Sequence, residues 1–154
     1  MKKNQGFSLV ELIVVIAIMA VLVGVLAPAY LRYVEKSRKS TDVSSISDIL
    51  AAAEKVAIDP EYDLKSGAKF ELNGATGGKL TMSVTDGTTD DAGALAEWKA
   101  IAGDGYTCKS KEFKTACSGW SFSGELKPEG SVEWTISAEA LTTFSPDFAK
   151  KWTS

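Results

Sequence analysis

The chain begins with a long apolar segment that is unlike anything that follows it. The residues from Leu12 to Leu31 carry no charge. As a helix, these 20 residues would extend about 30 Å, which matches the hydrocarbon thickness of a bilayer. Apolar side chains surround the helix on every side, so no single face is marked out for one partner. The pattern predicts a membrane-spanning helix within residues 7–31.

The helical pattern continues beyond the membrane segment. Apolar residues recur at steps of three and four, at Val43, Ile46, Ile49, Leu50, Ala53, Val56 and Ala57. This spacing predicts an amphipathic continuation of the helix over residues 32–58, and Asp59-Pro60 is expected to stop it. At the membrane exit lies a collar that we interpret as solvated or facing lipid headgroups. It contains Arg32, Lys36, Arg38 and Lys39, with Glu35 and Asp42 among them and with Tyr30 and Tyr33 as interfacial aromatics.

Residues 59–154 are predicted to form a globular head built on antiparallel strands. Apolar and polar residues alternate over 68–73 and 79–85, with a glycine-rich turn between them, which predicts a β-hairpin. The same alternation over 118–124 and 131–137, around a turn that contains proline and glycine, predicts a second hairpin. We therefore expect four antiparallel strands.

Two further segments of the head favour helix. Residues 91–102 are rich in good helix formers, and residues 138–152 are expected to form a helical or irregular tail. Together the elements predict an α+β fold, in which the second half of a long amino-terminal helix packs on a small antiparallel sheet.

The composition narrows the classes of function. With 154 residues, the chain suits one soluble domain on a membrane stem. Its formal net charge of -3 argues against nucleic acid as the main partner. The chain has no histidine, which is the usual general base at neutral pH and the commonest metal ligand. We therefore expect no enzymatic activity and no cofactor.

Three aspartates form a weak candidate for a calcium site. Asp86, Asp90 and Asp91 lie in one short acidic segment. Their spacing lacks the alternating ligands and the closing glutamate of an EF-hand. A solvated loop is the favoured interpretation, and no metal site is assigned.

The two cysteines enclose a short loop. Cys108 and Cys117 fall in the part of the chain that lies across the membrane if the amino terminus stays inside. An oxidising exterior favours a disulfide between them, and their spacing differs from the CxxC motifs of most zinc and redox sites. We predict a bridge, with two unpaired thiols as the alternative.

Three interpretations compete for residues 1–31. A cleaved signal peptide is supported by Ala27-Pro28-Ala29, which imitates a signal-peptidase site, but the apolar run is too long for it. A plain membrane anchor accounts for the length and, through Lys2 and Lys3, for an amino terminus inside the cell. Neither explains Glu11, a costly carboxylate at the head of an apolar segment. The third interpretation is a short leader followed by a retained helix.

The residues around Glu11 support this third interpretation. The segment Gly6-Phe7-Ser8-Leu9-Val10-Glu11-Leu12, preceded by a basic leader, resembles the class III signal of type IV prepilins and the related pseudopilins. The resemblance implies that a membrane aspartyl peptidase cuts after Gly6 and that the new terminal residue, Phe7, is N-methylated. Ser8 replaces the threonine of many members, and Pro28 falls where many carry a helix-kinking proline.

Glu11 has a physical role in such a filament subunit. When apolar helices leave lipid for a protein core, a lone carboxylate is tolerated there only if it is paired. The amino group of Phe7 on the adjacent subunit is the expected partner, and the pair would also set the axial register of the subunits.

Gly24 and Pro28 are expected to disturb the helix. Pro28 has no N–H to donate to the carbonyl of Gly24, so we predict a kink or local unwinding between them. For Gly24, ordinary close packing of helices is an equal alternative.

The resemblance implies a structural subunit of a type IV pilus or pilus-like filament. Its parts would be a leader (1–6), a transmembrane and filament-core helix (7–31), an amphipathic continuation (32–58) and a pilin-like head (59–154). The subunit would be held in the cytoplasmic membrane with its amino terminus inside, and on the cell surface after assembly.

The implied partners of this subunit are further copies of itself, minor pilins, a prepilin peptidase and N-methyltransferase, an assembly ATPase and a platform protein. Adhesion, twitching motility and DNA uptake are all compatible with the resemblance. The alternatives are a pseudopilin of a type II secretion or competence system and, from another class, a membrane-anchored extracellular binding or enzymatic domain that does not polymerise.

Overall fold

A computed structural model describes residues 7–86, 91–144 and 146–152 of the chain. The chain divides into two compact units, whose boundary lies between Ser37 and Arg38. The long helix α1, Leu9–Ala57, contributes its first part to one unit and its second part to the other.

The first part of α1 is apolar on all sides. In length and composition α1 is sufficient to cross a membrane, since an 18-residue window has a mean hydropathy of 3.1 and none of it is buried inside the protein. The helix ends at Ala57, directly before Ile58 and Asp59-Pro60. The long helix and its expected stop are therefore confirmed.

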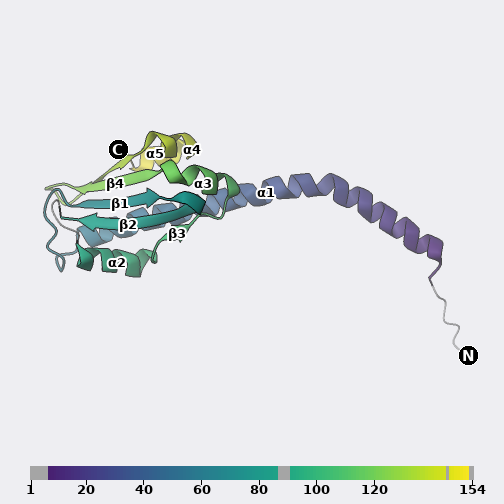
Figure 1. Ribbon diagram of the computed structural model, residues 1–154, viewed down its shortest axis with the longest axis horizontal. Helices are drawn as coiled ribbons and strands as arrows, with labels where there is room; N and C mark the ends of the chain where they lie inside the picture. Colours follow the sequence, from purple (N-terminus) through teal and green to yellow (C-terminus); the bar gives the residue numbers. More distant parts are fainter. Residues whose placement is uncertain (1–6, 87–90, 145, 153–154) are drawn as a thin grey trace, which may run out of the picture. The chain divides into compact units, whose positions relative to one another are not determined.

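The second unit is built on an antiparallel sheet with the strand order β3-β2-β1-β4-β5 (Figure 1). Its strands are β1 (Lys69–Gly74), β2 (Lys79–Thr85), β3 (Tyr106–Thr107), β4 (Ser121–Leu126) and β5 (Val132–Ile136). Leu72 lies opposite Met82 on one side and Phe122 on the other, and all three side chains are buried. One face of the sheet is thus apolar, as the period-two alternation predicts.

Helices cover this apolar face. The second part of α1 lies over it, held at one side by α2 (Ala92–Ala102), whose Trp98 donates its indole N–H to the carbonyl of Ile49 at 2.8 Å. At the other side, Phe148 of α5 (Pro146–Trp152) packs edge to face on Phe122, with ring centroids 6.4 Å apart. The helix α4 (Ala138–Thr143) precedes α5.

A short helix closes the end of the sheet toward which β1 points (Figure 1). It is α3, Lys111–Ala116, and the one-turn 3₁₀ segments η1 (Thr76–Gly78) and η2 (Cys117–Gly119) pack against it. The hydroxyl of Ser110 caps α3 by accepting a hydrogen bond from Phe113 N–H at 3.3 Å.

The predicted elements are confirmed, and the structure adds the short elements β3, α3, η1 and η2. The α+β class, both hairpins and the helix near residues 91–102 occur as expected. The sheet has a fifth strand, β3, and β4 begins at Ser121 because residues 117–119 form η2. The remaining tail after β5 is helical in α4 and α5.

Candidate assembly surface

Glu11 sits in the first turn of α1 and contacts the residue directly before the helix. The backbone N–H of Ser8 donates to Glu11 Oε2 at 2.9 Å. Ser8 directly precedes the helix, so the carboxylate satisfies one of the backbone donors that a helix start leaves open, as in a capping box. A carboxylate can accept several hydrogen bonds, so this cap leaves capacity for a further donor.

Phe7 lies beside this cap with 92% of its surface exposed. Gly6, the other side of the predicted cleavage point, lies outside the described residues. Cleavage after Gly6 and methylation of Phe7 remain predictions.

The first unit exposes an extensive apolar surface. Its large apolar side chains from Leu9 to Leu31 have exposed fractions between 46% and 73%. A contiguous apolar patch of this extent requires lipid or a protein partner. The surface surrounds the helix, so it suits either a bilayer or a core formed by several neighbouring helices.

Gly24 and Pro28 do not interrupt α1. Every residue between them is helical, so local unwinding, one of the two predicted outcomes, is absent from this segment. A Cβ atom at Gly24 would meet no other atom within 4 Å. Within one chain, therefore, packing does not require glycine at this position, and a bend at Pro28 remains a prediction.

Asp42, which was expected in the solvated collar, is instead a buried carboxylate of the second unit. Asp42 of α1 is 0% exposed. It accepts hydrogen bonds from the Tyr106 hydroxyl at 2.7 Å and from the backbone N–H groups of Lys109 and Ser110, each at 2.8 Å. Burial, the largest cause, and the neighbouring Asp42 carboxylate raise the pKa of Tyr106 to about 12. Asp42 therefore anchors the segment between β3 and α3 to α1.

The two cysteines lie side by side in the head as free, buried thiols. The neighbouring Cys117 thiol, which is the largest cause, and burial raise the pKa of the Cys108 thiol. Cys117 Sγ also lies 3.6 Å from the carbonyl oxygen of Ala75 and 3.5 Å from that of Lys79. The predicted bridge is not formed in this structure, which has the unpaired thiols of the alternative, and oxidation of the pair remains a prediction.

The calcium candidates do not form a cluster. The carboxylate of Asp91 accepts a hydrogen bond from Ala94 N–H at 2.9 Å and so caps α2. Asp86 is exposed, and Asp90 lies outside the described residues. Among the residues that the structure describes, no three carboxylates, cysteines or histidines are grouped as a metal site would need.

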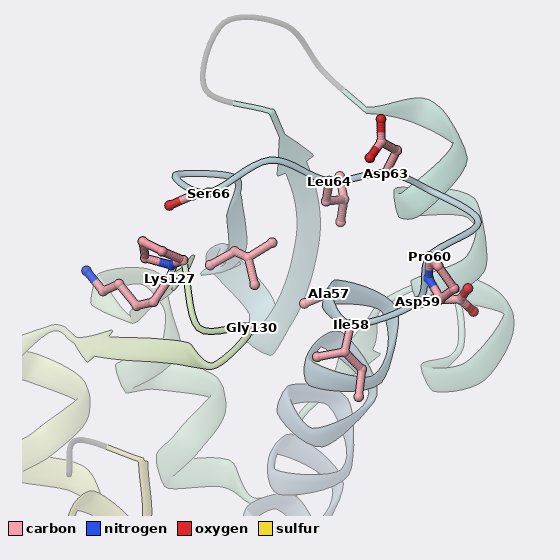
Figure 2. Close-up of a pocket in the computed structure, with 11 residues that line it drawn as sticks. Ala57, Ile58, Asp59, Pro60, Asp63, Leu64, Ser66, Lys127 and Gly130 are labelled. Atoms are coloured by element: carbon pink, nitrogen blue, oxygen red, sulfur yellow. The ribbon is translucent and has the colours of Figure 1, made fainter.

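A cavity of about 310 Å³ lies at the end of the head where α1 stops, and the β4–β5 turn forms one of its walls (Figure 2). Leu64, Pro60 and Ala57 contribute apolar lining. Figure 2 shows the carboxylates of Asp59 and Asp63 turned outward from this cavity. The arrangement suits an acidic outer surface better than an internal ligand site.

The chain is similar to known proteins. Residues 1–27 match the family model of the prokaryotic N-terminal methylation motif. Over 121 residues the chain is 30% identical to the type IV major fimbrial protein FimA of Dichelobacter nodosus, an alignment that covers 78% of this chain and 74% of that protein.

Two other relatives extend the comparison. A fimbrial protein of Pseudomonas aeruginosa is 31% identical over 98 residues, covering 56% of this chain and 62% of that protein. The chain thus spans somewhat under two thirds of the length of this relative. The fimbrial protein EcpC of Eikenella corrodens is 27% identical over 142 residues, with 88% of this chain and 90% of the relative covered. No solved structure matches the chain.

Proposed function

Because the chain belongs to the type IV pilin family, we propose that it is a structural subunit of a type IV pilus or pilus-like filament. The observation that carries the proposal is a helix with its apolar side chains exposed all round from Leu9 to Leu31 and a carboxylate, Glu11, in its first turn. Such a helix suits lipid, and it also suits a core formed by the same helix of other copies.

Assembly would move α1 from lipid into the filament core. The subunit would be cut after Gly6, methylated at Phe7 and polymerised through α1. In the filament, Glu11 would pair with the Phe7 amino group of a neighbouring copy, which offsets the cost of burying the carboxylate. The head, which has its own buried core, would cover the surface of the fibre.

The same proposal implies a membrane topology and a set of partners. Before assembly the subunit would cross the cytoplasmic membrane once, with Lys2 and Lys3 on the inner side. A prepilin peptidase and N-methyltransferase, an assembly ATPase, a platform protein and minor pilins would be its partners. The protein would have a structural function and no enzymatic one.

The first test is intact-mass and amino-terminal analysis of the protein from membranes and from sheared surface fibres. We expect fibres to contain a chain that begins at methylated Phe7. A chain that begins at Met1 and occurs only in membranes would contradict the proposal and indicate a simple anchored domain. A chain that begins at Tyr30 would instead identify Ala27-Pro28-Ala29 as a signal-peptidase site.

The cysteine pair gives a second prediction. In fibres isolated without reductant, we expect Cys108 and Cys117 to resist alkylation until a reductant is added. The bridge would stabilise the head by about 2–3 kcal/mol, the value for a short closed loop, so Cys117→Ser should lower the thermal midpoint. Alkylation of both thiols in denatured, unreduced fibres would show that the bridge is absent.

A further inference from the structure

One end of the head carries a cluster of lysines, here called the basic end. Lys39 of α1 forms an ion pair with Glu112 of α3, which places these two helices together. Lys111 and Lys114 extend the cluster along α3, and both are exposed. Lys114 lies against η1, because a Cβ at Gly78 would fall 2.6 Å from its Cγ. The basic end thus combines side chains from two helices beside the start of β2.

Among the described residues, carboxylates near the basic end include Glu112, Asp42 and, against Gly119 of η2, Glu139. Glu112 is engaged by Lys39, and Asp42 is buried beneath the neighbouring loop. Asp104, which lies toward Lys79, forms an ion pair with Lys99 at 2.9 Å. The exposed Lys109, together with Lys39, Lys111 and Lys114, keeps this end basic although the chain as a whole is negative.

The opposite end of the head, here called the acidic tip, carries carboxylates. Asp59, Glu61 and Asp63 follow the end of α1 closely. The carboxylates of Glu97, Glu61 and Asp59 lie near Tyr62 and, with burial as the largest cause, raise the pKa of its hydroxyl.

The β4–β5 turn lines the same cavity as the end of α1 and adds further carboxylates to the acidic tip. Glu125 and Glu133 lie 3.5 and 2.9 Å from Lys127 Nζ, so two carboxylates share this lysine. Glu129 is exposed on the turn itself. Carboxylates outnumber the lysines of this tip, which are Lys55, Lys65, Lys69 and Lys127.

The two surfaces lie at opposite ends of the part of α1 that belongs to the head. Lys39 and Ala57 are 18 residues apart along the helix, which corresponds to about 27 Å. A filament is built from heterologous contacts, in which one patch of a subunit meets a different patch of the next. Two patches of opposite charge at the two ends of a head suit such a contact.

We propose that the basic end of one head docks against the acidic tip of a second copy of this chain, and that this contact sets the register between heads in the fibre. The inference rests on the proposed function, since it requires that the subunit polymerises. A single exposed ion pair contributes little to stability. When the contact is repeated along a fibre, it adds to the association of the α1 helices. Its main effect is to fix the register between heads and to disfavour wrong pairings.

The test is a charge exchange in the full-length chain. Lys111→Glu with Lys114→Glu reverses two charges of the basic end, and Glu61→Lys with Glu129→Lys reverses two charges of the acidic tip; all four side chains are exposed. At low ionic strength we expect each double variant to place about threefold to tenfold fewer subunits in fibres than the wild type. The chain with all four changes should return to near wild-type assembly, because the complementarity is restored with the ends exchanged.

The outcomes separate this inference from the proposed function. Carbodiimide cross-linking of fibres grown from mixed isotope-labelled copies should join Lys111 or Lys114 of one copy to Glu61 or Glu129 of another. If wild-type fibres form but the fourfold variant assembles no better than the double variants, and no such cross-link appears, the inference is overturned. If only the basic-end variant is impaired, and it also loses binding to vesicles rich in anionic lipid, the basic end meets lipid headgroups and the inference is likewise wrong. Absence of wild-type fibres overturns the inference together with the proposed function, since the inferred contact requires a fibre.

Discussion

Glu11→Ala is expected to leave membrane insertion and leader cleavage intact and to reduce fibre assembly by at least about tenfold. The substitution removes the hydrogen bond that Ser8 N–H donates to the carboxylate. It also removes the charge that would pair with the Phe7 amine of the next copy. A charge-assisted hydrogen bond is worth about 1.5–3 kcal/mol, which corresponds to a factor of ten or more in an equilibrium constant. The ratio of subunit in sheared fibres to subunit in membranes is the quantity to measure.

A matched variant separates the two roles of Glu11. Glu11→Gln retains a carbonyl oxygen that can accept from Ser8 N–H, as glutamine does in a capping box, but it removes the negative charge. If pairing with the neighbouring amine is the decisive role, Glu11→Gln should assemble as poorly as Glu11→Ala. Assembly of Glu11→Gln at the wild-type level would assign the effect to the helix start and contradict the register role. Intact mass of the membrane fraction must show equal cleavage in all three proteins.

A recognisable motif and periodic patterns that extend over whole segments predicted most of the fold correctly. The family resemblance in Gly6-Phe7-Ser8-Leu9-Val10-Glu11-Leu12 is confirmed by the match of residues 1–27 and by the fimbrial relatives. The hairpins were predictable because Phe70, Leu72, Met82 and Val84 alternate with polar residues on strands that pair directly. The strand signal repeats over many residues, so it is stronger than the local preference of any one of them.

The elements that were missed are short. The strand β3 has only two residues, Tyr106 and Thr107, and α3 has six, Lys111–Ala116. Neither is long enough to establish a period, and their positions are set by contacts with residues distant in the sequence. The hydrogen bonds from Lys109 and Ser110 to Asp42 cross more than sixty positions of the chain. Such pairings are decided by tertiary packing and are not visible in a local window.

One signal for Asp42 was present in the sequence. Asp42 lies four residues before Ile46 and seven before Ile49, so it falls on the same face of α1 as the buried apolar residues. A carboxylate at an inward position requires partners. The sequence therefore indicates that Asp42 has hydrogen-bond partners. It does not show that these partners lie between β3 and α3. The same limit applies to the basic end and the acidic tip, whose members come from separate elements.

Asp42→Ala is expected to destabilise the head by about 3–5 kcal/mol, with α1 and leader cleavage unaffected. The change would leave the N–H groups of Lys109 and Ser110 and the hydroxyl of Tyr106 without their acceptor, and each unsatisfied buried group costs about 1–3 kcal/mol. The segment that carries Cys108 would lose its anchor on α1. Thermal unfolding of the full-length protein in detergent, followed through the signal of the aromatic core, measures the effect.

Two further variants test whether the cost comes from the hydrogen bonds to Asp42. Tyr106→Phe removes only the hydroxyl, and the remaining contacts of Asp42 are retained, so the expected loss is about 1–2 kcal/mol. Lys39→Gln removes the neighbouring exposed ion pair with Glu112 and should cost less than about 1 kcal/mol. If Asp42→Ala were no more harmful than Lys39→Gln, the carboxylate would not anchor the segment between β3 and α3. The order Asp42→Ala, Tyr106→Phe, Lys39→Gln follows from burial and from the number of hydrogen bonds lost, and a different order would contradict this account of the head.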